Sequence, residues 1–277
     1  MLKPGLYLVA TPIGNLGDLT PRAAEVLTMA NRVYAEDTRH TQKLFNHFDI
    51  HTELRSLHQH NEASRAAEIK QSILNGETIA LVTDAGTPGI SDPGSTIVDA
   101  LLAAEMTVSP VPGASSLSAA LSVSGFDHGE YGTLWAGFLP QKRKARRDAL
   151  ATFVRFPGVV VFLESPHRIE ACASDLSELF GERELVVCRE LTKKFETVYR
   201  TTCSAFPSIS KEAARGELTI VLGPGSVQVD SEEGDALEAL YKLLDAGFSA
   251  KDASKAASLL FEIPKKVLYT AAIAKKG

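Results

Sequence analysis

Polar loops that contain glycine or proline follow three apolar runs in the first half of the chain. The longest, Thr83–Gly94, comes after Ile79–Val82, and the other two are Thr11–Leu19 and Pro112–Ser116. Glycine and proline fix turns that let backbone N–H groups approach a ligand closely. If the runs are parallel strands, all three loops open at one edge of a sheet, where α/β proteins bind small ligands. The loops therefore predict a ligand pocket, and the alternative is a set of tight turns without a ligand.

The loop sequences exclude several kinds of pocket. None matches Gly-x-Gly-x-x-Gly or Gly-x-x-x-x-Gly-Lys-Ser/Thr, which disfavours hydride transfer from a dinucleotide and phosphoryl transfer from a triphosphate. His40, His58 and His60 lack the spacing of metal ligands. The three cysteines form no Cys-x-x-Cys pair, so we predict neither a disulfide framework nor a metal site.

The clearest basic run lies near the middle of the chain. Gln141–Arg147 holds five positive charges and no acid, in Lys142, Arg143, Lys144, Arg146 and Arg147. A solvated helix face usually mixes both signs of charge, whereas clustered Lys and Arg bind phosphates of a polyanion. We therefore predict phosphate binding here, with a solvated face as the alternative.

The elements that must position these residues alternate between strand and helix over the first 125 residues, as a mostly parallel sheet requires. Hydrophobic patterns predict strands at 6–10, 32–36, 78–83 and 107–111, and helices at 21–30, 62–74, 95–104 and 117–124. Glycines interrupt 126–138, which we interpret as the passage between domains. A helix at 145–156 and strands at 159–163, 185–189, 197–201 and 218–222 predict a second α/β domain. Ser165 is expected to cap a helix that begins at Pro166.

The remaining residues predict a small helical module. Pro224-Gly225 and the acidic run Asp230–Glu233 indicate a linker, and three helical patterns follow at 235–246, 249–261 and 264–274. Their arrangement is similar to a helix-turn-helix, and the lysines at 265, 266, 275 and 276 form a second basic area. A structural cap is the alternative. The expected domains are residues 1–125, 126–228 and 229–277.

Bulk composition agrees with this organisation. The chain has 277 residues, 44% of them hydrophobic, and a formal charge of −5, which fits a globular protein of two domains and an appendage. No apolar run reaches the roughly 20 residues that span a bilayer, and the first residues lack the pattern of an export signal. We therefore expect a cytoplasmic protein without a membrane segment.

Seven short motifs, in order along nearly the whole chain, resemble the tetrapyrrole-methylase-like family of class III methyltransferases. They are Val9–Thr20, Ala35–Arg39, Asp84–Pro88, Val111–Gly113, Glu164–Arg168, Arg189–Lys193 and Gly216-Glu217. The resemblance implies two α/β domains with a cleft for S-adenosylmethionine between them. It also implies a homodimer and methyl transfer to the ribose 2′-oxygen of a cytidine in small-subunit ribosomal RNA, free or in the assembled subunit.

The resemblance also implies which residues bind the cofactor. Thr87 stands where the wider family has Asp, and Asp84 is a nearby carboxylate that could replace it. The residues expected to bind S-adenosylmethionine are Pro12, Asp84, Gly86, Thr87, Ile90, Ser115, Ser116, Leu163, Glu217 and Leu218.

A ribose hydroxyl needs a base to accept its proton, and a carboxylate within hydrogen-bond reach is a usual choice. Asp37 is our first candidate and Glu36 the second, since both end a strand at the edge that carries the loops. Arg39 and His40 follow and are expected to contact the RNA. Arg39 is expected to bind a phosphate and is also counted among the catalytic candidates. The alternative is an ion pair between Asp37 and Arg39 that only shapes the loop.

Two further sets of polar residues can each be interpreted in two ways. Glu164–Arg168 is either a strand end with a capped helix or a set of polar residues that face the cleft. Lys193 and Lys194 belong either to a solvated face or to an RNA channel. The competing functions are methylation of a small tetrapyrrole-type molecule and nucleic-acid binding without catalysis.

Overall fold

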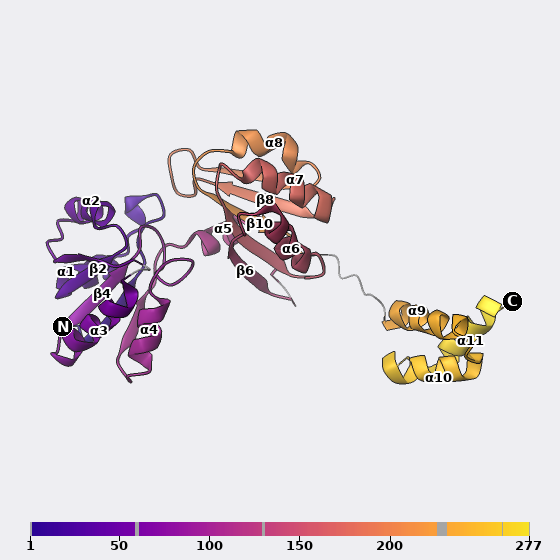
Figure 1. Ribbon diagram of the computed structural model, residues 1–277. Helices are drawn as coiled ribbons and strands as arrows, with labels where there is room; N and C mark the ends of the chain where they lie inside the picture. The colour runs from indigo at the N-terminus through magenta and orange to yellow at the C-terminus, as the bar shows by residue number, and fades with distance from the viewer. Residues whose placement is uncertain (1, 59–60, 129–130, 226–231, 262, 277) are drawn as a thin grey trace. The chain divides into compact units, whose positions relative to one another are not determined.

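A computed structural model describes residues 2–58, 61–128, 131–225, 232–261 and 263–276. Its contacts divide the chain into two compact units, residues 1–154 with 158–224 and residues 155–157 with 225–277 (Figure 1). The first unit holds two five-stranded sheets. The predicted α/β fold with C-terminal helices is confirmed, and the expected boundary at 228/229 and the linker residues Asp230 and Ser231 lie outside the described residues.

The first sheet is entirely parallel and has the strand order β3-β2-β4-β1-β5. Its strands are β1 (Gly5–Val9), β2 (Arg32–Ala35), β3 (Leu54–Ser56), β4 (Thr78–Val82) and β5 (Val108–Val111). The helices of this half are α1 (Pro21–Met29), α2 (Thr38–Phe48), α3 (Glu62–Leu74) and α4 (Ser95–Leu102), with a 3₁₀ turn η1 (Leu16–Asp18). All strands end at one edge, as the loop pattern predicted.

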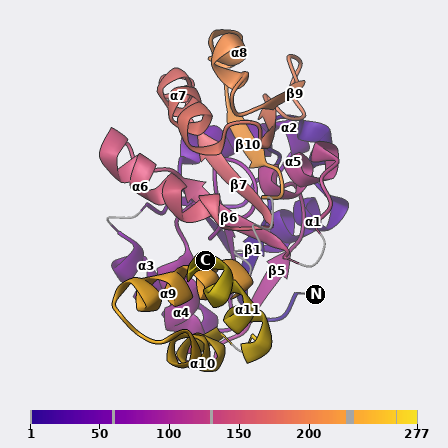
Figure 2. The ribbon, with the colours of Figure 1, turned by 90° about the vertical axis from the view of Figure 1, so that its right-hand side faces the viewer.

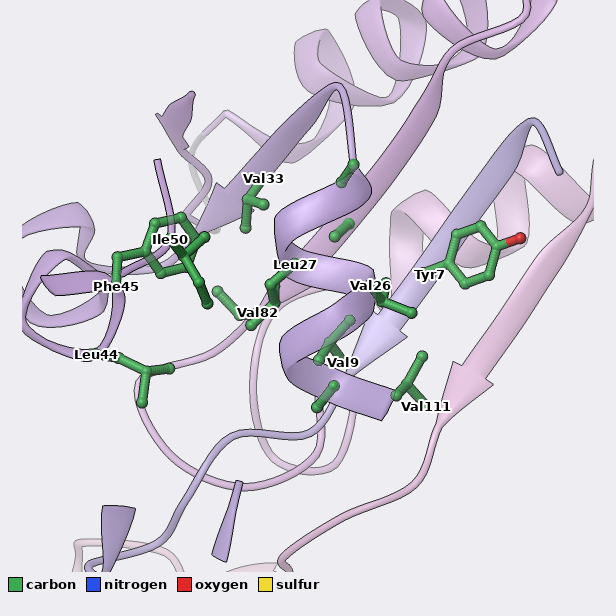
Figure 3. Close-up of a cluster of buried hydrophobic side chains, with 14 of the residues drawn as sticks. Tyr7, Val9, Val26, Leu27, Val33, Leu44, Phe45, Ile50, Val82 and Val111 are labelled. Atoms are coloured by element: carbon green, nitrogen blue, oxygen red, sulfur yellow. The ribbon is translucent and has the colours of Figure 1, made fainter. Parts of the chain in front are cut away.

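Helices cover both faces of this sheet because the strands are apolar on both sides. On one face, Val26 and Leu27 of α1 pack against Val9, Val33 and Val82, as Figure 3 shows. On the other face, side chains of α3 and α4 form a second buried cluster that includes Ile69, Ile73, Ile97 and Leu101. The two clusters fix the strand ends from which the loops emerge.

The edge strand β5 carries Pro110, opposite Leu8 of β1. The carbonyls of Thr107 and Val111 accept hydrogen bonds from β1 and the residue after it, so alternation places Pro110 on the outer side of the ladder. A guanidinium N–H of Arg22 donates to the Pro110 carbonyl at 3.2 Å. At Pro110 this edge therefore has no backbone N–H to offer a further strand, and the Pro110 carbonyl already accepts a hydrogen bond from Arg22.

The second sheet is mixed and has the order β6-β7-β10-β8-β9, with a parallel pair β6–β7 and antiparallel pairs elsewhere. Its strands are β6 (Thr133–Phe138), β7 (Val159–Glu164), β8 (Glu184–Arg189), β9 (Thr197–Thr202) and β10 (Leu218–Leu222). The associated helices are α5 (Ser116–Ser124), α6 (Arg143–Val154), α7 (Ile169–Phe180) and α8 (Phe206–Ala213). The α5 helix packs against β10, and α7 packs against both α6 and α8.

Several elements differ from the sequence-based prediction. Residues 133–138, interpreted as a passage between domains, form the edge strand β6, and α2, β3 and α8 were not predicted. Helix α7 begins at Ile169 with Arg168 at its N-cap, so the prediction that Ser165 caps a helix from Pro166 is wrong. Ser165 instead donates its backbone N–H to Glu164 Oε1 at 2.8 Å.

The second unit contains α9 (Glu232–Asp245), α10 (Ala250–Phe261) and α11 (Lys265–Lys276), which lie side by side in both views (Figures 1 and 2). Their core consists of small and apolar residues, among them Leu240, Ala253, Ala257 and Leu268. The three predicted helices are present. In the described part of the chain, no helix combines the length and hydropathy needed to cross a bilayer.

Candidate functional site

A cavity of about 430 Å³ lies where the loops of the first sheet meet the second sheet. Nine of the ten residues expected to bind the cofactor line it, and Pro12 does not, although its neighbour Ile13 does. The lining residues used below are Ile13, Glu36, Asp84, Gly86, Thr87, Asp92, Ser115, Trp135, Phe138, Leu163, Glu164 and Glu217. The sequence missed Trp135, Phe138 and Asp92, because the first two belong to the unpredicted strand β6 and Asp92 was considered only as part of a turn.

Backbone hydrogen bonds tie the loops around the cavity together. Thr11 and Gly86 form an isolated antiparallel bridge, with N···O distances of 2.9 and 3.1 Å. The φ of Gly86 is +83°, a conformation that favours glycine. The Thr87 hydroxyl donates to the Ala114 carbonyl at 3.4 Å, which joins the second loop to the third. Thr87 therefore links two of the loops that border the cavity.

Five acidic residues line the cavity, and three of them, Glu36, Asp84 and Asp92, influence one another electrostatically. Asp84 Oδ1 accepts a hydrogen bond from the backbone N–H of Asp37 at 3.1 Å. Burial and the charges of Glu36 and Asp84 raise the pKa of Asp92 to about 6. Burial, followed by the charge of Asp84, also raises the pKa of Glu36. The cavity is therefore arranged to accept a cation, because a positive ligand relieves the repulsion among these groups.

Asp37, our first candidate for the base, is not among the residues that line the cavity. It is the N-cap of α2, and its Oδ1 accepts the backbone N–H of Arg39 at 2.8 Å. The Arg39 guanidinium donates to both carboxylate oxygens, at 3.2 and 2.9 Å. The Arg39 side chain, through these hydrogen bonds, lowers the pKa of Asp37 to about 2, so the carboxylate is a weak base. Asp37, Arg39 and His40 are absent from the cavity lining, and the ion-pair alternative describes Asp37 and Arg39 better.

Two ion pairs lie at strand ends of the second sheet, at or near the cavity. Glu164 is buried and pairs with Arg168 at 2.9 Å, while it also accepts from Ser165, so Glu164–Arg168 both ends a strand and lines the cavity. Glu190 accepts from Lys193 Nζ and from the backbone N–H of Glu217, both at 2.9 Å.

The loop that carries Glu190 adopts an unusual backbone conformation. Glu190 and Thr192 have φ values of +52° and +66°, and Gly216 leaves room for the Glu190 side chain. Lys193 also forms an ion pair with Glu217 at 3.2 Å. The Lys194 ammonium lies over the Phe195 ring at 5.7 Å.

The basic run is largely neutralised by α7, which corrects part of our phosphate-binding prediction. Arg146 is 3% exposed, and its guanidinium contacts Asp175 Oδ2 at 2.7 Å. Arg143 and Arg147 reach Asp175 Oδ1 at 3.3 and 3.1 Å, and both also pair with Glu178. Arg146 cannot reach a phosphate from this position. Lys142 and Lys144 are exposed and stay candidates for RNA contacts.

No group of His, Cys, Asp or Glu with the geometry of a metal site occurs among the residues that the structure describes. His60 lies outside these residues. All three cysteines are free and buried, and burial raises the pKa of each thiol.

Comparisons with known proteins identify the family of the chain. A family model described as tetrapyrrole (corrin/porphyrin) methylases matches residues 5–207. The chain is 43% identical over 274 residues to the ribosomal RNA small subunit methyltransferase I of Xylella fastidiosa (strain Temecula1 / ATCC 700964), covering 97% of this chain and 99% of that protein. It is 39% identical over 276 residues to the protein of the same name from Escherichia coli O157:H7, with coverage of 98% and 96%.

Solved structures show the same fold at low sequence identity. The methyltransferase CobJ aligns with a TM-score of 0.60 and 16% identity, covering 79% of this chain and 94% of that one. Uroporphyrin-III C-methyltransferase from Thermus thermophilus, in complex with S-adenosylhomocysteine, aligns with a TM-score of 0.53 and 23% identity, covering 80% and 98%.

Proposed function

Because the chain belongs to the tetrapyrrole (corrin/porphyrin) methylase family, we propose that it methylates small-subunit ribosomal RNA with S-adenosylmethionine as the methyl donor. The observation that supports this substrate is the identity of about 40% with ribosomal RNA small subunit methyltransferase I proteins over nearly their whole length. The sequence motifs further support a cytidine ribose 2′-oxygen as the acceptor.

The cavity fits S-adenosylmethionine in size and chemistry. Its volume of about 430 Å³ lies within the usual range for small-molecule pockets. The cofactor supplies a methyl group on a sulfonium cation and carries an α-ammonium group, and the Glu36, Asp84 and Asp92 carboxylates suit these charges. Trp135, Phe138 and Leu163 provide apolar surface for the adenine. The bound cofactor is expected to be held by these groups and by the Gly86 and Ser115 loops.

The residues of this chain have two tasks in methyl transfer. They must hold the acceptor oxygen in line with the methyl carbon, a positioning effect worth up to roughly 7–11 kcal/mol in favourable cases. They must also accept the proton of the hydroxyl. We assign this second task to Glu36, because it follows β2 inside the cavity and its raised pKa makes it a stronger base than Asp37.

Isotope transfer tests the proposed reaction directly. Small ribosomal subunits that lack this modification, and the naked ribosomal RNA, are incubated with the protein and S-adenosylmethionine labelled in its methyl group. We expect label on one cytidine ribose, found by nucleotide mapping. Label on a base would contradict the acceptor, and label on an added tetrapyrrole but not on RNA would support the small-molecule alternative. Calorimetry that detects no cofactor binding would support a non-catalytic RNA-binding protein.

We also propose that the protein is a cytoplasmic homodimer, which the family resemblance supports. Light scattering coupled to size-exclusion chromatography should give twice the 29.7 kDa chain mass. A mass of one chain at micromolar concentration would contradict the dimer.

A further inference from the structure

The C-terminal helical unit has a cavity of its own, of about 430 Å³, lined by Lys251, Lys265, Lys266 and Tyr269. Lys251 lies in the first turn of α10, and Lys265 and Lys266 open α11. The structure therefore brings together three cations from two different helices, with an aromatic ring beside them. Sequence spacing alone grouped Lys265 with Lys275 and did not include Lys251.

The described lysines of this unit include some that form ion pairs and others, those of the cavity, that do not. Lys242 pairs with Glu238 at 2.8 Å, and Lys275 pairs with Asp245 at 2.8 Å. Among the described residues, no carboxylate lies within ion-pair distance of the three lysines of the cavity. Asp252, next to Lys251 in the sequence, accepts a hydrogen bond from the Ser249 hydroxyl at 2.5 Å. Glu262, three residues before Lys265, lies outside the described residues. The cavity thus presents a concentrated positive charge in a chain whose net charge is −5.

In the free protein, the lysine charges interact unfavourably with the dipoles of the helices that carry them. A helix N-terminus carries a partial positive charge, so cations in the first turn are destabilising and anions are favoured there. Helix α11 has two lysines and no acid in its first turn. An anion bound between the two helix starts would relieve both this repulsion and the mutual repulsion of the lysines.

Tyr269 indicates which anion fits. Its side chain is 41% exposed, and it follows Lys265 by one helical turn on α11, so its ring borders the lysine cluster. Exposed aromatic rings beside basic groups are typical of single-stranded nucleic-acid sites, where a base stacks on the ring and lysines contact phosphates.

We propose that this cavity binds the backbone of a single-stranded segment of RNA, with Lys251, Lys265 and Lys266 on phosphates and Tyr269 stacked on a base. The inference rests on the proposed function, because it assigns a second contact to the same ribosomal substrate. The RNA is then held at a site in the C-terminal unit in addition to the methyl-transfer cavity.

The buried core of the unit does not depend on these side chains. It consists of Ala236, Leu240, Leu244, Ala253, Ala257, Leu268 and Ala272. Substitutions on the exposed cavity should therefore leave the helices folded, which circular dichroism of the full-length variants checks.

The experiment measures the affinity of the full-length protein for unmodified small-subunit ribosomal RNA at several salt concentrations. The variant K251A/K265A/K266A should bind at least about tenfold more weakly. The slope of its log K against log[salt] should become less negative by about 0.7–0.9 for each phosphate that the variant no longer neutralises. The single variants K242A and K255A are matched controls, because Lys242 is paired and Lys255 is outside the cavity on α10. Both controls should keep the wild-type slope.

Variants of Tyr269 test whether its ring stacks on a base. Tyr269→Ala should weaken binding by about tenfold, whereas Tyr269→Phe should bind as the wild type does. Cofactor affinity, measured by calorimetry, should be unchanged in every variant.

Two results would overturn the inference: a wild-type salt slope in the triple lysine variant, or equal effects of the controls and the cavity variants. Failure of the proposed function looks different, because wild-type protein would then transfer no label to ribosomal RNA. Wild-type methylation together with an unaltered lysine variant rejects only the second RNA site.

Discussion

Glu36 and Asp37 are neighbours in the chain, and their carboxylates have opposite surroundings. Asp37 is bound by Arg39 and by a helix N-terminus, while Glu36 faces a cavity that it shares with Asp84 and Asp92. A group that is already paired binds a proton weakly, and a group that is repelled by other carboxylates binds one more strongly. Glu36 at the strand end therefore has a raised pKa, whereas Asp37 at the helix cap, one residue later, has a lowered pKa.

Replacing Glu36 tests the base directly. Glu36→Gln should lower the single-turnover methylation rate at saturating cofactor by about 10²–10⁴-fold, because the amide cannot accept the hydroxyl proton. Asp37→Asn is the matched control and should keep most of the rate with a lower melting temperature, since it weakens the α2 cap and the Arg39 pair. If instead Asp37→Asn abolishes turnover in a folded protein, the base is Asp37.

Asp92 should make cofactor affinity depend on pH. Its pKa of about 6 means that the carboxylate becomes ionised as the pH rises through 6, which increases its attraction for a cationic ligand. We expect the dissociation constant of S-adenosylmethionine, measured by calorimetry between pH 5 and pH 8, to decrease over this interval.

The variant Asp92→Asn should bind the cofactor more weakly at pH 8 and lose most of this pH dependence. Asp18→Asn, in the exposed 3₁₀ turn outside the cavity, should keep the wild-type profile. Identical profiles for the wild type and Asp92→Asn would show that Asp92 does not face the cation.

At the scale of elements, α6 and α7 are joined by charge. Three arginines of α6 converge on Asp175 of α7, whose side chain is fully buried, and two of them also reach Glu178. From the sequence, the arginines formed a basic run without acids, because their partners lie 28 or more residues away. The three arginines of the run therefore mainly connect two helices, while Lys142, Lys144 and much of the Arg143 side chain are exposed to solvent.

Removal of Asp175 should be strongly destabilising. Asp175→Asn leaves Arg146 buried without its counter-charge, a change that typically costs about 3–5 kcal/mol of unfolding free energy. Glu178→Gln, at a half-exposed partner in the same cluster, should cost less than about 1 kcal/mol. Urea denaturation measures both, and equal destabilisation by the two variants would contradict the central role of Asp175.

At the scale of the whole molecule, the fold was predictable from the sequence where hydrophobic patterns and turn residues indicated the same element. Buried strands such as Thr78–Val82 are continuous apolar runs followed by glycine loops, and the Glu62–Leu74 helix ends at Asn75-Gly76. These signals identified four of the five strands of the first sheet. The nine predicted residues that line the cavity came from the resemblance to the family.

The missed features depend on contacts between distant segments. Helix α2 is rich in polar residues, so its N-cap Asp37 was interpreted as a catalytic group. Strand β6 is interrupted by a register shift between Trp135 and Gly137, which breaks the alternation expected of a strand. The raised pKa of Asp92 needs two carboxylates from other loops, and no local pattern contains that information.

The Pro110 edge has a consequence for how the protein behaves at high concentration. An open sheet edge is a template on which another chain can add a strand, and proline removes a donor that such pairing requires. Pro110→Val should therefore increase turbidity on prolonged incubation near the melting temperature, while a conservative change at a covered strand, Val33→Ile, should not have this effect. With the outer backbone donor missing at Pro110 and its carbonyl bound by Arg22, strand β5 is a poor template for the addition of a strand from another molecule.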